Sequence, residues 1–265
     1  MAGVGAPPVP GAMSAPVPSM AFMRSTTTPG ALAGRASWDA LRARARTAMA
    51  GLPAPPGPGP GVCAACRGPL RPGHARCFQC SLHAQSAPGM LADVVAPVAY
   101  APKGGCLARN LWLYKSARPE AGQAGTALRA LLLVFLHDHG GLVWQQARMT
   151  APTHACVVPS RRGRPGPHPL YVLLGEFLAL PWTVLRIGPG ADPLARTLDP
   201  DRFHALRPLS GASVLLLDDT WTSGGTAQSA AVALKRAGAR SVAAVVLGRH
   251  VAAGAATGCR PASGQ

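Results

Sequence analysis

The segment that decides the fold spans residues 213–238 and reads SVLLLDDTWTSGGTAQSAAVALKRAG. Its apolar run at 213–217 is short and uninterrupted, which is typical of a strand buried on both faces of a parallel sheet. A helical pattern follows at about 226–237 and is closed by Gly238. A strand that leads through a short loop into a helix is half of a β-α-β unit, so this segment predicts an α/β architecture.

Strand-like and helical patterns alternate along the chain from residue 91 onward. Strands are predicted at 93–99, 155–159, 183–187, 213–217 and 242–247, and helices at 124–137, 168–180 and 226–237. The helix at 124–137 is expected to end at His139-Gly140-Gly141, because glycine favours helix ends. We therefore expect a parallel twisted sheet flanked by helices.

Two carboxylates and a loop of hydroxyls and glycines follow the apolar run. Asp218 and Asp219 would lie at the carboxyl end of a parallel strand, where α/β folds bind ligands. The loop 222–226 then opens a helix, so its N–H groups and the helix dipole would converge on one anion, most naturally a phosphate. Because carboxylates beside a phosphate suit ribose hydroxyls, the pattern predicts a ribose-5-phosphate site; the alternative is a polar turn and helix cap. The segment contains no Gly-Lys-Ser/Thr, which excludes a Walker-type loop.

Two Cys-x-x-Cys pairs, separated by ten residues, lie upstream of the α/β segment. Their members are Cys63, Cys66, Cys77 and Cys80. Four thiolates complete the tetrahedron that zinc prefers and leave no open position, so we predict a structural zinc site whose metal drives the folding of this small segment. Two disulfides are the alternative, and His74 or His83 is close enough in sequence to replace a ligand.

Composition divides the chain into three parts. Residues 1–60 are rich in Pro, Ala and Gly and cannot offset the entropy of ordering, so we expect a disordered tail in which 38–50 is compatible with a short helix. Residues 61–90 form the predicted zinc ribbon and 91–265 the α/β domain.

The start of the chain lacks the basic region and apolar core of a signal peptide, and the apolar run at 131–136 is too short for a membrane span. We expect a cytoplasmic protein without a membrane partner.

The charge of the chain is strongly basic. It has 26 Lys and Arg against 10 Asp and Glu, a formal net charge of +16. This balance favours nucleic acid, anionic lipid or phosphorylated small molecules as partners. The sequence contains no run of five or six basic residues, which argues against a nucleic-acid-binding arm, and a GC-rich coding bias would also produce an excess of Arg over Lys.

The segment 214–226, Val-Leu-Leu-Leu-Asp-Asp-Thr-Trp-Thr-Ser-Gly-Gly-Thr, resembles the phosphoribosyl-pyrophosphate motif of type I phosphoribosyltransferases. With the four cysteines and Tyr114-Lys115, the chain is similar to the ComF-like branch, in which a zinc ribbon precedes the transferase domain. The resemblance covers about residues 60–250. It implies a type I phosphoribosyltransferase-like fold and transfer of phosphoribosyl to a nitrogen nucleophile with release of diphosphate. Magnesium is expected to accompany the donor.

The resemblance also implies roles for individual residues. Asp218 and Asp219 would hold the 2′- and 3′-hydroxyls of the ribose, and Arg202 would correspond to a basic residue in the family's mobile hood. The residues implied in binding the 5-phosphate or the diphosphate are Lys115, Ser160, Arg161, Arg162, Thr222, Ser223, Gly224, Gly225 and Thr226.

The chain departs from the ComF-like pattern in two places. Residues 164–169 read Arg-Pro-Gly-Pro-His-Pro where that branch usually carries Arg-Gly-Phe-Asn, and the stretch 199–209 is shorter than the usual hood. The nitrogen acceptor is therefore left unassigned, as is the oligomeric state. Two other functions stay open: a nucleic-acid-binding protein associated with DNA uptake, and a fold that binds the donor without turning it over.

Overall fold

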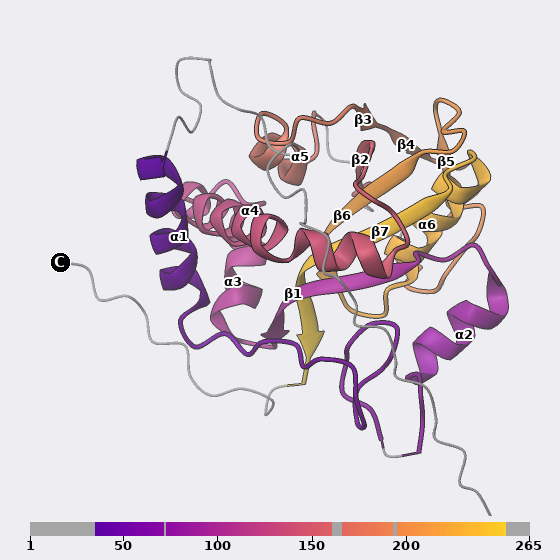
Figure 1. Cartoon of the computed structure of the whole chain (residues 1–265), viewed down its shortest axis with the longest axis horizontal. Helices are drawn as coiled ribbons and strands as arrows, with labels where there is room; N and C mark the ends of the chain where they lie inside the picture. The colour runs from indigo at the N-terminus through magenta and orange to yellow at the C-terminus, as the bar shows by residue number, and fades with distance from the viewer. Residues whose placement is uncertain (1–34, 72, 161–165, 193–194, 253–265) are drawn as a thin grey trace, which may run out of the picture.

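A computed structural model describes residues 35–252, except residues 72, 161–165 and 193–194 (Figure 1). The predicted disordered stretch before residue 35 lies outside the described residues. So do Arg161 and Arg162, the two arginines predicted to face the diphosphate. Their roles stay predictions.

The core of the protein is a five-stranded sheet whose strands all run parallel. Its order is β1-β7-β6-β2-β3, which confirms the parallel sheet predicted from the sequence. The strands are β1 (Val94–Pro102), β2 (His154–Val157), β3 (Trp182–Thr183), β6 (Ser213–Trp221) and β7 (Ser241–Val251).

Helices cover both faces of this sheet (Figure 1). The layer on one face holds α1 (Arg35–Met49), α3 (Cys106–Leu113), α4 (Ala121–Gln146) and α5 (Pro169–Leu174), and α6 (Gly225–Arg236) lies on the other. Side chains of β6 alternate between the layers: Leu215 and Leu217 pack with α4, whereas Val214 and Leu216 pack with α6. The uninterrupted apolar run of β6 is thus explained by burial on both faces.

The helix α4 is longer than predicted, because it continues through Gly140 and Gly141 to Gln146. A side chain at Gly140 would press against the indole ring of Trp144, with a nearest distance of 3.2 Å. Val143 and Trp144 are buried, so packing of the last turns outweighs the low helix propensity of two glycines. By length and composition α4 is the one helix among the described residues that could cross a membrane, and much of it is buried in the core.

Two other predicted elements differ from the structure, and one helix of the structure is not predicted. The helix predicted at 168–180 spans only Pro169–Leu174, since Gly175 caps it. The strand predicted at 183–187 is two strands: β3 joins the main sheet, whereas β4 (Leu185–Ile187) pairs antiparallel with β5 (Phe203–Ala205) in a separate two-stranded sheet. The helix α2 (Phe78–Ser86), which follows the third cysteine, is not predicted from the sequence pattern.

The N-terminal helix α1 packs on α4. Its Leu41 and Ala45 are buried in the same apolar cluster as α4, and Arg42 forms an ion pair of 3.1 Å with Asp138. Beyond the helix, the carbonyl of Pro53 accepts a hydrogen bond of 2.9 Å from the N–H of Tyr100 in β1. Of the described residues before 61, α1 and the chain near Pro53 therefore pack on the domain, whereas residues 56–60 are exposed.

Candidate functional site

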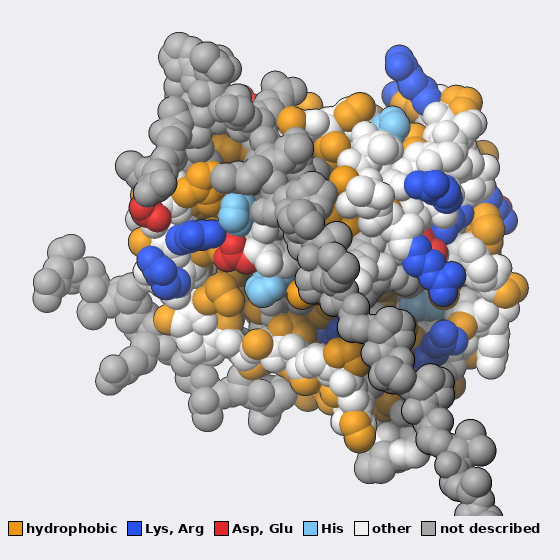
Figure 2. Space-filling model, in the orientation of Figure 1, with side chains coloured by type: hydrophobic (Ala, Val, Ile, Leu, Met, Phe, Trp, Pro, Cys, Tyr) orange, Lys and Arg blue, Asp and Glu red, His pale blue; other side chains and the backbone are white. Residues whose placement is uncertain are grey.

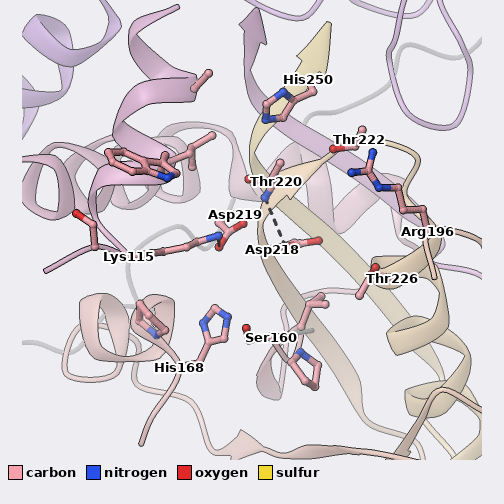
Figure 3. A pocket seen from close by; sticks show the side chains of 17 residues that line it. Lys115, Ser160, His168, Arg196, Asp218, Asp219, Thr220, Thr222, Thr226 and His250 are labelled. Atoms are coloured by element: carbon pink, nitrogen blue, oxygen red, sulfur yellow. Dashed lines mark hydrogen bonds and ion pairs between the residues drawn. The ribbon is translucent and has the colours of Figure 1, made fainter. Parts of the chain in front are cut away.

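The carboxyl end of the sheet borders a cavity of about 690 Å³ (Figure 3). Asp218 and Asp219 reach it from the last residues of β6. The predicted residues that line this cavity together are Lys115, Ser160, Asp218, Asp219, Thr222 and Thr226. Figure 3 shows Lys115 extending toward the two aspartates from one side, with Thr222 and Thr226 on the opposite side. Three segments far apart in the sequence, around Lys115, Ser160 and 218–226, thus meet at one place.

Residues 222–226, which we call the phosphate loop, connect β6 to α6. Gly224 is the N-cap of α6 and has φ of +85°, a left-handed conformation that favours glycine. A Cβ added to Gly224 would lie 2.1 Å from the buried indole ring of Trp221, so a larger residue has no room. The loop leads into the first turn of α6, whose N–H groups have no partner within the helix. The start of a helix with such free N–H groups favours an anion.

The segment 195–197 lies across the phosphate loop. A Cβ added to Gly225 would lie 2.3 Å from the carbonyl oxygen of Arg196. The hydroxyl of Ser223 donates to that same carbonyl at 2.5 Å. Contact this close explains why the loop carries a second glycine.

Arg202 holds the segment 195–197 in place. It is almost completely buried, at 1% exposure. Its guanidinium donates to the carbonyls of Ala195 at 2.8 Å and Thr197 at 3.1 Å, and to the hydroxyl of Thr226 at 3.3 Å. The resemblance implies that Arg202 corresponds to a basic residue of the family's hood, which stays a prediction; in the structure Arg202 fastens this segment to the start of α6.

Asp219 is tied to the end of α3. Its carboxylate accepts a hydrogen bond of 2.5 Å from the hydroxyl of Tyr114 and forms an ion pair with Lys115. Burial opposes ionisation of Asp219, but Lys115 and the hydrogen bonds from Lys115, Tyr114 and Thr220 outweigh it, so the pKa of Asp219 lies below its ordinary value. Asp219 is therefore a carboxylate at neutral pH.

Asp218 has the opposite electrostatic character. Burial and the neighbouring charge of Asp219 raise the pKa of Asp218 to about 7, although Lys115 and backbone N–H groups favour its charged form. Paired acids whose environments drive their pKa values apart are typical of functional sites. Near neutral pH, Asp218 can accept or donate a hydrogen bond.

Several residues of the cavity were missed by the sequence analysis. They are Trp112, His168, Arg196 and His250. Two of them are placed by general rules: His250 lies near the carboxyl end of β7, beside β6, and His168 is the N-cap of α5. Arg196 has an exposed side chain close to Thr222 and Thr226 in Figure 3. The position of His250 at the end of a buried strand is a signal that could have found it.

The four cysteines form a compact cluster, with all four sulfurs within 4.8 Å of one another. They are free thiols and not the alternative pair of disulfides. Tetrahedral coordination with Zn–S bonds of about 2.3 Å requires sulfurs about 3.8 Å apart, and Cys66 and Cys77 lie 3.9 Å apart. The donor set fits a metal ion. His74 is exposed, and the cluster among the described residues consists of cysteines only.

Comparison with known proteins gave matches among solved structures only. No family model matches the chain, and no curated protein matches it. Adenine phosphoribosyltransferase from Leishmania tarentolae is 19% identical, with 58% of this chain and 90% of that chain covered at a TM-score of 0.30. Adenine phosphoribosyltransferase from Leishmania donovani is 19% identical, with 60% of this chain and 85% of that chain covered at a TM-score of 0.31. A purine phosphoribosyltransferase from Pyrococcus horikoshii is 14% identical, with 46% of this chain and 90% of that chain covered at a TM-score of 0.24. Similarity at this level does not assign a function, so a proposed function must rest on the chemistry of the cavity.

Proposed function

We propose that this protein binds phosphoribosyl pyrophosphate and transfers its phosphoribosyl group to a nitrogen nucleophile, releasing diphosphate. The observation that carries the proposal is the cavity itself. It combines a helix-opening loop of hydroxyls and glycines with two carboxylates and a lysine. Each part matches one part of a donor that has a phosphate, a ribose diol and a diphosphate.

The phosphate loop suits the 5-phosphate. The N–H groups at the start of α6 and the helix dipole favour an anion there. The hydroxyls of Thr222 and Thr226 line the cavity on the same side, and Arg196 adds a positive charge. Because Ser223 and the 195–197 segment already contact each other, phosphate binding is expected to shift that segment and free the Ser223 hydroxyl.

The two aspartates suit the ribose hydroxyls. Asp219 is ionised and accepts hydrogen bonds, as its contacts with Tyr114 and Lys115 show. In the structure Lys115 neutralises Asp219. We propose that Lys115 turns to the diphosphate when the donor binds, so that the ribose hydroxyls replace it at the carboxylate.

The transfer reaction follows from this arrangement. The nitrogen lone pair forms a bond to C1 of the ribose as the bond from C1 to the diphosphate oxygen breaks. Diphosphate leaves with the bonding electrons, and the nitrogen then loses a proton to solvent. The chain contributes orientation of the donor and stabilisation of negative charge on the leaving group by Lys115. Magnesium, which binds phosphate oxygens and water, would supply further neutralisation and is compatible with the oxygen-rich cavity.

Calorimetry tests donor binding directly. The full chain, loaded with zinc and supplied with magnesium, is titrated with phosphoribosyl pyrophosphate, and diphosphate release is then measured with a panel of aromatic and aliphatic amines. We expect Asp218→Ala combined with Asp219→Ala to weaken binding by about a hundredfold, since two hydrogen-bonding carboxylates are lost. The matched control is Asp138→Asn, which removes a carboxylate remote from the cavity.

The possible outcomes separate the candidate functions. Absence of donor binding to the zinc-loaded chain would overturn the proposal. Donor binding that depends on the two aspartates but yields no diphosphate with any acceptor would identify a donor-sensing protein.

A further inference from the structure

Arg249, near the end of β7, lies between the cysteine cluster and the phosphate loop. It pairs in register with Trp221, the last residue of β6. Its Nη1 donates to the carbonyls of Thr222 at 3.1 Å, Trp221 at 3.4 Å and His250 at 2.7 Å. The guanidinium thus contacts the backbone where β6 passes into the phosphate loop.

The other terminal nitrogen of Arg249 contacts the cysteine cluster. Its Nη2 donates to the Sγ of Cys66 at 3.5 Å. A Cβ added to Gly68, just after the first cysteine pair, would lie 2.6 Å from the same nitrogen, so the turn fits closely around the guanidinium. Because a guanidinium is a planar fork with several donors, one side chain can hold both segments.

The apolar core joins the same two regions. Cys63, Cys66 and Cys80 are buried in one cluster with Trp221 and the apolar face of α6. The hydroxyl of Tyr100 in β1 donates to the carbonyl of Arg67 at 2.5 Å, which fastens the turn between the cysteine pairs to the sheet. The cysteine cluster is therefore attached to the elements that shape the cavity.

We propose that Arg249 is a positioning residue that couples metal binding at the cysteine cluster to the phosphate loop, so that loss of the metal weakens donor binding. The inference rests on the proposed function for its donor. A metal-bound thiolate at Cys66 is held in one position and orients the guanidinium, as outer-shell hydrogen bonds do in other metal sites. Removal of the metal releases the turn around Arg249, and the carbonyls of Trp221 and Thr222 lose an oriented donor.

Two variants and one control test the link. Arg249→Met removes the donors at similar length, and Gly68→Ala displaces the guanidinium without altering Arg249 itself. Arg240→Met removes an exposed arginine and makes the same change in net charge. In the unmodified chain and the control, zinc removal by a chelator should weaken donor binding about tenfold, a typical coupling between sites. In Arg249→Met, zinc removal should change the affinity for the donor by less than about twofold.

Amide hydrogen exchange provides a readout that needs no donor. In the unmodified chain, zinc removal should raise exchange at residues 222–226, and Arg249→Met and Gly68→Ala should raise it while zinc is still bound. Zinc-dependent exchange without donor binding would refute the proposed function and leave the link intact. Donor binding and loop exchange that are the same with and without zinc would refute the link and leave the proposed function intact.

Discussion

Asp218 and Asp219 are neighbours in sequence, yet the structure predicts opposite effects on stability. The pKa of Asp218 is raised to about 7, so the folded state binds a proton that the unfolded chain has already lost above its ordinary pKa. The stability from this group is fully present below its ordinary pKa and is lost as the pH rises through about 7. Asp219, with a lowered pKa, contributes stability above its ordinary pKa that is lost on acidification.

At pH 8, we therefore expect Asp218→Asn to stabilise the fold and Asp219→Asn to destabilise it. The gain for Asp218→Asn should be of the order of a few kcal/mol, because one pKa unit corresponds to about 1.4 kcal/mol. Urea unfolding at pH 5 and pH 8 measures both effects. Equal destabilisation by both substitutions at pH 8 would show that the two acids do not differ as described.

The second glycine of the phosphate loop gives another residue-scale prediction. Gly225→Ala places a methyl group where the carbonyl of Arg196 lies, and this backbone segment is held by Arg202. We expect donor binding to weaken more than about tenfold, as the loop must be displaced. Gly122→Ala is the control, because a Cβ there meets nothing within 4 Å. Unchanged donor affinity in Gly225→Ala would mean that the loop does not contact the phosphate.

At the scale of elements, α1 offers a test of where the packed unit begins. Leu41 of α1 is buried in the apolar cluster that α1 shares with α4. We expect Leu41→Ala to lower the free energy of unfolding by about 2–3 kcal/mol, typical of a buried leucine. Arg44→Ala, at an exposed position of the same helix, should change it by less than about 0.5 kcal/mol. Urea denaturation measures both free energies of unfolding. Equal losses in the two variants would show that α1 does not pack in the apolar core.

The elements also show what the sequence could and could not predict. The apolar run of β6 and the acids after it were predictable, because strand, loop and helix signals are all local. The continuation of α4 was not, since it depends on packing by Val143 and Trp144 that overrides two glycines. The contacts of Arg202 and the neighbours of Arg249 also could not be predicted, because they join segments distant in sequence.

For the whole molecule, the positive charge allows a prediction about nucleic acid. On the face drawn in Figure 2, Lys and Arg side chains form separate groups near α1 and near α6, with acidic side chains beside them. We expect binding to duplex DNA to be weak at about 50 mM salt and absent at about 200 mM. Fluorescence anisotropy measures this, and binding that survives at the higher salt would favour a nucleic-acid function.

The central claim concerns the cavity at the carboxyl ends of the parallel strands, and a crystal soaked with phosphoribosyl pyrophosphate and magnesium tests it most directly. We predict the 5-phosphate at the N–H groups of residues 222–226, with the ribose hydroxyls at Asp218 and Asp219. Lys115 should have moved from Asp219 toward the diphosphate. A donor bound elsewhere, or a cavity that stays empty at saturating donor, would contradict the account.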